Sequence, residues 1–136
     1  MTLLHLLMPA LLALGPTPAG VLHAWDDQRA RAWADGDVGA LRQLYTPGSV
    51  AGQTDAAMLR AWRSRGLRVT GLRMQLLAVE VRARTPARMV LDVTDRLAGG
   101  VAVPGRVALP RDQPSRHVVT LRLVAGEWRV SRVRPG

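Results

Sequence analysis

The sequence predicts an α+β fold, with helices in the N-terminal part of the chain and an antiparallel sheet in the remainder. Between Val21 and Gly66, apolar residues recur at steps of three and four, which is the spacing of amphipathic helices. After Gly66, apolar and polar residues alternate as in half-buried strands, and turn signals separate the alternating stretches. Helices segregated from sequential hairpins indicate the α+β class and argue against a parallel sheet.

The first 20 residues are predicted to be a signal peptide or a short apolar anchor. Met1–Leu14 is almost wholly apolar, and Gly15, Pro16 and Pro18 then break any helix. Fourteen helical residues reach about 21 Å, which is less than the roughly 30 Å of a bilayer core. The segment is therefore expected to direct export, to secretion or to the cell envelope, or to contact a membrane transiently. No Arg or Lys precedes it, so a core helix of a cytoplasmic protein is the alternative.

Residues 21–136 are predicted to form one domain, because about 115 residues support a single hydrophobic core. The composition, with 48% hydrophobic and 21% charged residues, is that of a folded globular protein. The sequence contains no cysteine, which excludes disulfides, a thiolate nucleophile and a cysteine-based zinc site. No internal repeat or linker divides this part of the chain.

Three helices are expected in the first half of the predicted domain. The first runs from Val21 to Gly36, and glycine commonly ends a helix. Its inward face collects Leu22, Trp25, Arg29, Ala32 and Trp33. Asp37 is a suitable N-cap for a second, short helix. The apolar stripe of that helix is Val38, Leu41, Leu44 and Tyr45. Thr54 or Asp55 is expected to cap a third helix. The residues that it is expected to bury are Met58, Leu59 and Trp62.

A hairpin is expected next. Leu77–Arg84 alternates apolar and polar residues, Thr85–Arg88 is a turn signal, and Met89–Leu97 alternates again. The pairs Gly99–Gly100 and Pro104–Gly105 are expected to interrupt the chain on either side of a short strand. The later strands are expected at 101–103, 107–109, 118–123 and from Trp128 to the C-terminus, with a loop at 110–114 and a tight turn at 125–127.

Motifs at both ends of the predicted domain resemble a known superfamily. The chain opens with Ala24–Asp26, Trp33–Asp37 and Leu41–Pro47, and it closes with Val118–Leu121 and Gly126–Val130. A helix, then A-x-G-D, then L-x-x-L-Y, with a final G-x-W-x-V strand, resembles the nuclear transport factor 2-like superfamily. That superfamily includes the polyketide-cyclase and ketosteroid-isomerase relatives. The resemblance covers roughly residues 21–134 and implies N-terminal helices packed on a bent antiparallel sheet, a cone-shaped, cystatin-like roll with an apolar pocket. It implies no single function, because such cones hold isomerases, dehydratases, cyclases and non-catalytic binding modules.

Four residues are candidates for the site. On their predicted strands, Asp95, His117 and Arg132 each share the parity of the apolar residues, so an acid, an imidazole and a guanidinium could approach one cavity. A partly buried Asp has its pKa raised by desolvation and can act as a base. The resemblance implies the same use of Asp95 and His117, because isomerases and dehydratases of the superfamily transfer protons with an Asp or an Asp–His pair. It also puts Tyr45 near the cone mouth, as a ligand hydroxyl.

A structural role for the same residues is the alternative. His117 and Arg132 lie near strand ends, where side chains often reach solvent, and Asp95 could pair with an arginine in the core. No cofactor is expected, because the sequence has no Gly-rich phosphate loop, no metal-spaced histidine pair and no serine elbow. No metal site is expected either, since the spacing of His23 and His117 does not support zinc.

The net charge of +9 comes entirely from arginine, because the chain has no lysine. The arginines are spread from Arg29 to Arg134, which argues against a nucleic-acid footprint, although such a charge favours anionic surroundings. The expected partner is a small apolar ligand or another envelope protein, and the chain is expected to be a monomer or a homodimer.

Three functions follow from these observations. The first is a non-catalytic, exported ligand-binding or accessory module at the cell envelope. The second is a cofactor-independent enzyme of the isomerase or dehydratase type, which acts on a small apolar substrate through Asp95 and His117. The third is a basic module that binds an anionic polymer. Exposed stacking aromatics, which single-strand binders use beside a basic track, have few candidates here.

Overall fold

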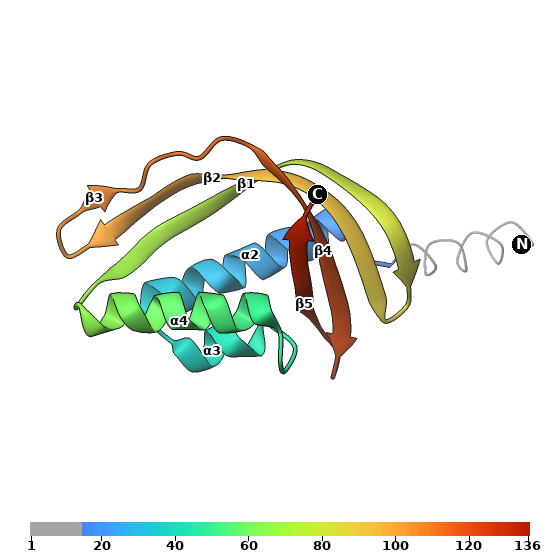
Figure 1. Ribbon diagram of the computed structural model, residues 1–136, viewed down its shortest axis with the longest axis horizontal. Coiled ribbons are helices and arrows are strands. Elements are labelled where there is room, and N and C mark those ends of the chain that lie inside the picture. Colours follow the sequence, from blue (N-terminus) through green and yellow to red (C-terminus); the bar gives the residue numbers. More distant parts are fainter. Residues whose placement is uncertain (1–14) are drawn as a thin grey trace, which may run out of the picture.

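The computed structural model describes residues 15–136, in which three helices precede five strands. The helices are α2 (Pro18–Asp35), α3 (Val38–Gln43) and α4 (Val50–Ser64). The strands are β1 (Arg68–Thr85), β2 (Arg88–Val103), β3 (Val107–Ala108), β4 (Ser115–Val124) and β5 (Glu127–Pro135). Because the helices pack on one side of an antiparallel sheet, the predicted α+β class is confirmed (Figure 1). Among the described residues, no helix has both the length and the apolar character needed to cross a membrane.

The predicted N-terminal unit, residues 1–20, lies largely outside the described residues. Its last part is the first turn of α2, which begins at Pro18, three residues earlier than expected. The hydroxyl of Thr17 accepts a hydrogen bond from the Gly20 backbone N–H at 3.0 Å and caps the helix. Gly36 ends the helix with a φ of 64°, the left-handed conformation that glycine adopts without strain.

The second and third helices begin at different kinds of cap. Asp37 caps α3 as predicted, because its carboxylate accepts from the Ala40 N–H at 3.0 Å. The prediction for α4 is wrong: Ser49 is the N-cap, and its hydroxyl accepts from the Gly52 N–H. Asp55 lies inside α4 and is buried, because an arginine of α2 neutralises it there.

The sheet has the order β1-β2-β4-β5, all antiparallel, with β3 added along β2. The long strands β1 and β2 arch over α2 and α4, and the hairpin of β4 and β5 closes one end (Figure 1). Two predictions about these strands are wrong. The first strand starts at Arg68 rather than at Leu77, and Gly99–Gly100 lies within β2 instead of interrupting it. The glycines continue the ladder because Gly99 pairs with Arg73.

Bulges in β1 explain why its simple alternation does not predict the buried face. The register with β2 shifts between Leu76 and Ala78, so the extra residue reverses the parity of the strand. Leu76 and Val79 pack against the core, whereas Leu77, the extra residue of the bulge, is about half exposed. The predicted alternation therefore holds at Val79 and Val81, which pair with the buried Val93 and Leu91, but not at Leu77.

The core lies between the helices and the concave side of the sheet, here called the inner face. Its fully buried members are Leu41, Leu59, Met89, Leu91, Val93, Leu121 and Val130. The alternation predicted for β2 is confirmed, because Met89, Leu91 and Val93 are all buried. All four tryptophans belong to the core or pack against it. The burial predicted for Met58 is wrong: the side chain is half exposed, because it lies on the side of α4 that borders a cavity.

Candidate functional site

A cavity of about 990 Å³ lies between the inner face of the sheet and the helices. Its lining is mostly apolar and comes from α2, the loop after α3, α4 and strands β1, β2, β4 and β5. The apolar part includes Leu22, Trp25, Trp62, Leu72, Met74, Leu76, Val93 and Val119. All four residues predicted from the sequence, Tyr45, Asp95, His117 and Arg132, contribute to the lining.

Asp95 and His117 form the polar centre of the sheet wall. They come from neighbouring strands, because Asp95 of β2 pairs with Ser115 and Val93 pairs with His117 of β4. The Nε2 atom of His117 lies 3.5 Å from Oδ1 of Asp95. The carboxylate of Asp95 raises the pKa of His117, and this effect exceeds the opposing effect of burial. The structure thus brings these two side chains together on the inner face.

Asp26 of α2 also lines the cavity, near enough to this pair for its charges to interact with theirs, and the sequence prediction missed it. Burial, followed by the negative charge of Asp95, raises the pKa of Asp26 to about 6, although Arg29 and His23 act in the opposite direction. The predicted inward face of this helix did not include Asp26. Its position directly after Trp25 and three residues before Arg29 puts it at the edge of the inward face, and that spacing was the available signal.

Tyr45 belongs to a buried network centred on Asp55. Its hydroxyl donates to Oδ2 of Asp55 at 2.6 Å, and the indole N–H of Trp33 donates to Oδ1 at 3.1 Å. Arg29 donates to both carboxylate oxygens, at 2.7 and 2.8 Å. The hydroxyl of Tyr45 thus has its proton committed to Asp55, so a ligand could reach it only by donating to its oxygen.

Burial alone would raise the pKa of Asp55, but the hydrogen bonds and charge of Arg29 and the hydrogen bonds of Tyr45 and Trp33 hold it below its usual value. The pKa of Tyr45 is raised, first by burial and then by the charge of Asp55. Asp55 is therefore a carboxylate, and Tyr45 a neutral phenol, at all ordinary pH values. The network ties α2, α4 and the loop after α3 into one wall of the cavity.

Arg132 lies at the border of the cavity rather than at its centre. The register between β4 and β5 shifts so that Leu121 pairs with Val130 and Thr120 pairs with Arg132. Ser131 is the extra residue, and the bulge turns Arg132 to the side of Thr120. The parity argument for Arg132 is therefore wrong, although the residue contributes to the lining and is exposed.

Comparison with known proteins identifies the fold. No family model matches the sequence, and no curated protein matches it. Solved structures do match. Aln2 from a Streptomyces species superposes with a TM-score of 0.59, at 14% identity, over 87% of this chain and 90% of that one. A nuclear transport factor 2-like protein from Cytophaga hutchinsonii gives 0.55, at 17% identity, over 86% and 95%. The chain has the nuclear transport factor 2-like fold.

A third match comes from a chloroplast protein. The intermembrane space region of the chloroplast protein ARC6 superposes on this chain with a TM-score of 0.58, at 11% identity, over 84% of this chain and 89% of that one. Identities this low show the shared fold alone. They carry no function over to this chain, whose own cavity determines what it can bind.

The cavity combines apolar walls with several titratable side chains, of which Asp26, Asp95 and His117 form one group. Asp26 changes its protonation state near pH 6, and the Asp95–His117 pair beside it can accept or hold a proton. Among residues 15–136, no three His, Asp or Glu side chains are grouped closely enough to hold a metal ion. The arrangement can bind an apolar molecule through a polar substituent and can exchange a proton with it.

Proposed function

We propose that this nuclear transport factor 2-like domain binds a small, largely apolar molecule and orients it through one polar group held by Asp95 and His117. The observation that carries the proposal is the position of these two residues in a mostly apolar cavity of about 990 Å³. Sites for small ligands commonly have this composition, with apolar walls and a few polar groups that fix orientation.

The polar wall determines which ligand group is recognised. Asp95 is buried and its carboxylate meets the ring of His117, so a ligand hydroxyl or amine can donate to the carboxylate oxygens that the histidine leaves free. The rest of the ligand would lie against side chains such as Leu72, Leu76 and Val119. An alcohol or amine on a compact hydrocarbon skeleton is therefore the ligand class that we propose.

Occupation of the cavity can be tested with N-phenyl-1-naphthylamine, a neutral apolar fluorophore that accepts energy from the tryptophans of the lining. Met74→Trp places a bulky side chain in the cavity, and we expect it to abolish binding without unfolding the domain. Leu77→Trp is the matched control, because Leu77 is half exposed and lies outside the lining. Equal binding by both variants would place the probe elsewhere and contradict the proposal.

Recognition of the polar group can be tested with two ligands of similar size, 2-naphthol and 2-methylnaphthalene. We expect 2-naphthol to bind about tenfold more tightly, because a hydrogen bond to a charged group contributes roughly 1.5–3 kcal/mol. Asp95→Ala should remove this preference while the affinity for 2-methylnaphthalene is kept. If both ligands bind equally to the wild-type protein, the assigned role of Asp95 is wrong.

A second candidate function is proton transfer, and Asp26 is the observation that favours it. A carboxyl group with a pKa of about 6 beside a carboxylate–imidazole pair supplies an acid and a base at the same pH. Solvent-deuterium exchange at the α-carbon of 2-tetralone, followed by NMR, tests this activity. Exchange that Asp95→Asn and Asp26→Asn each slow supports it. Exchange no faster than with heat-denatured protein rejects catalysis and leaves the binding function standing.

We also propose that the domain acts at the cell envelope, because the apolar run Leu3–Leu14 has the length of a signal-peptide core or a short anchor. Fractionation of host cells followed by N-terminal sequencing tests this location. A cytoplasmic product that begins at Met1 or Thr2 and has no membrane association would contradict it.

A further inference from the structure

Arginines that are dispersed in the sequence come together on the outer face of the sheet. Arg88 of β2 pairs in register with Arg122 of β4, and Arg122 pairs with Arg129 of β5. Residues in register on neighbouring strands lie on the same face, so these three side chains form a row across the sheet. Their neighbours Met89, Leu121 and Val130 are buried in the core, which places the row on the opposite, outer side.

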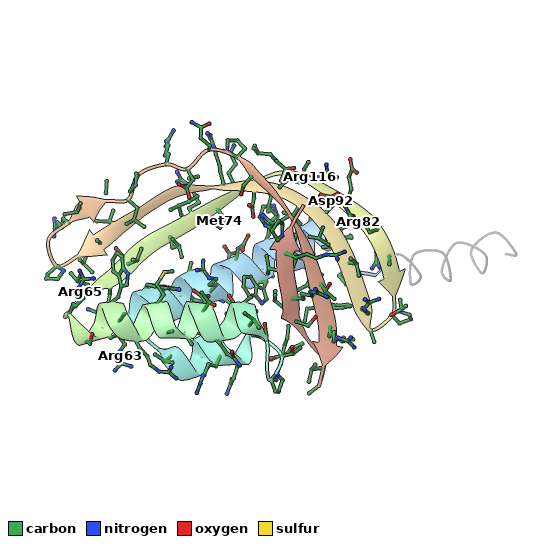
Figure 2. The ribbon with its side chains drawn as sticks, in the orientation of Figure 1. Arg63, Arg65, Met74, Arg82, Asp92 and Arg116 are labelled. Carbon is green, nitrogen blue, oxygen red and sulfur yellow. The ribbon has the colours of Figure 1, made fainter. Side chains whose placement is uncertain are left out.

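Four more arginines extend this row. Arg132 pairs with Thr120 and Arg134 pairs with Val118, so both lie on the same face as Arg122. Arg82 and Arg116 flank Asp92 on that face and are hydrogen-bonded to it (Figure 2). The seven arginines are called the arginine face below: Arg82, Arg88, Arg116, Arg122, Arg129, Arg132 and Arg134. The acidic residues among them are Glu80, Asp92 and Glu127.

The arginine face leaves positive charge uncompensated. Within the described part of the chain, the arginines of the row and also Arg132 and Arg134 form no ion pair with a carboxylate. Like charges directly opposite each other on a sheet are destabilising. In addition, the Nε atom of Arg129 is buried without a hydrogen-bond partner. An array of anionic oxygens lying over the row would offset the repulsion between these charges.

We propose that the arginine face docks on the anionic phosphates of a phospholipid membrane surface. The face spans neighbouring strands of one sheet, so its guanidinium groups can engage many headgroups at once. Nucleic acid is disfavoured because the four tryptophans pack with the core and are not available on this face as stacking platforms. A second copy of the chain is disfavoured as well, because a two-fold interface would press the same arginines against each other.

The position of the chain's N-terminal part supports a membrane as the partner. Arg84, at the end of β1, donates to the carbonyl oxygen of Pro16 at 2.8 Å, so the start of α2 lies at the β1–β2 hairpin. The Leu123 N–H donates to the Ala87 carbonyl, which brings the end of β4 to the same hairpin. In the sequence, the apolar run Leu3–Leu14 comes directly before this point. Stable membrane attachment commonly combines one apolar anchor with a basic patch.

The experiment measures sedimentation of the full chain with vesicles of phosphatidylcholine alone or mixed with phosphatidylglycerol. We expect binding to the mixed vesicles that weakens steeply with salt. The triple variant Arg88→Glu, Arg122→Glu, Arg134→Glu should weaken this binding by about 100-fold or more. All three side chains are exposed, and circular dichroism with thermal melting checks that the variant folds.

A matched control reverses the same number of charges elsewhere. Arg60, Arg63 and Arg65 are exposed near the end of α4, and Figure 2 shows Arg63 and Arg65 at the opposite end of the molecule from Arg82 and Arg116. The control triple to Glu is expected to retain binding within about threefold, after allowance for long-range charge.

Three results would overturn the proposal. Equal loss in both triple variants would mean that net charge alone attracts the protein. Equal binding of wild type to neutral and anionic vesicles would mean that the arginine face contributes nothing. Tighter binding of a DNA oligonucleotide than of anionic vesicles at the same salt, lost in the first triple variant, would assign the face to nucleic acid instead.

Discussion

Asp92 and Asp95 lie three residues apart on β2, and their surroundings could hardly differ more. Asp95 is on the inner face, where it meets His117 and contributes its charge to the environment of Asp26. Asp92 is on the outer face, between Arg82 and Arg116, whose side chains are 44% and 59% exposed. Each carboxylate is only 8% exposed as a residue, so burial of the acid alone does not distinguish the two environments.

The exposure of the cation does distinguish them. The hydrogen bonds from Arg116, and then those from Arg82, hold the pKa of Asp92 well below its usual value, but both arginines remain largely solvated. On the inner side, Asp55 binds Arg29, whose side chain is only 24% exposed, and it also accepts from Trp33 and Tyr45. Ion pairs on this side of the sheet are thus integral to the fold, whereas those on the outer side are surface interactions.

Asp55→Ala tests whether the buried ion pair on the inner side is integral to the fold. The substitution leaves Arg29 without its partner and removes the acceptor of Tyr45 and Trp33, so we expect a loss of about 3–5 kcal/mol in the free energy of unfolding. Urea denaturation followed by tryptophan fluorescence measures it. Asp37→Ala, which removes an exposed helix cap, is the control and should cost about 1 kcal/mol. A loss below about 1 kcal/mol for Asp55→Ala would show that the network is not integral to the fold.

Asp26→Asn tests the cavity itself. Unlike Asp55→Ala, it should stabilise the domain. A pKa of about 6 in the folded state, against 3.8 in the unfolded state, means that the folded state holds the proton more tightly. Stability therefore falls as the pH rises between these values, and the penalty is complete above about pH 6. We expect Asp26→Asn to stabilise the domain by about 1–2 kcal/mol at pH 8, after allowance for partial exposure, and to have no effect at pH 3.

The control for this prediction is Asp27→Asn, because Asp27 is the next residue and is exposed. Asp27 contributes only the smallest of the effects on the pKa of Asp26, so its substitution should change the pH dependence of stability much less than Asp26→Asn does. If Asp26→Asn instead destabilises the domain at pH 8, then the attraction of Arg29 and His23 outweighs burial, and Asp26 is not a candidate acid.

The sequence was sufficient for the parts of the fold that depend on local pattern. The cap at Asp37 and the turn between β1 and β2 are local features, and the inner face of β2 follows from alternation without interruption. The pairing of Asp95 with His117 could be inferred because both strands keep their parity over the relevant stretch. Alternation that runs unbroken over several residues was therefore sufficient to place these two side chains on the inner face.

The remaining features depend on β-bulges and on contacts between residues far apart in the sequence, which the alternation of apolar and polar residues does not predict. One extra residue at Ser131 moved Arg132 from the predicted inner side to the side of Thr120, and one near Leu77 reversed the faces of β1. Asp55 looked like a helix cap because its burial requires Arg29, which is 26 residues away in the sequence. The arginine face was hidden for the same reason: its members come together only through the strand register.

Asp92→Asn is expected to produce the smallest effect on stability. It tests whether the ion pairs of Asp92 on the outer face are only surface interactions. The folded-state pKa of Asp92 lies below its unfolded value, so its contribution is present above about pH 4 and disappears as the pH falls through the folded-state value. Because Arg82 and Arg116 are solvated, we expect a melting-temperature change smaller than for either inner-side variant. It should shrink further in 1 M salt, where the Debye length is about 3 Å.

The same substitution also separates the two proposed functions, membrane binding by the outer face and ligand binding by the cavity. Asp92→Asn releases Arg82 and Arg116 from their carboxylate, so the arginine face gains positive charge and should bind anionic vesicles more tightly. The cavity lies on the other side of the sheet, and its affinity for N-phenyl-1-naphthylamine should remain unchanged. A variant that melts far below the wild type, as Asp55→Ala is expected to, or that loses vesicle binding, would mean that Asp92 organises this face and does not merely neutralise part of it.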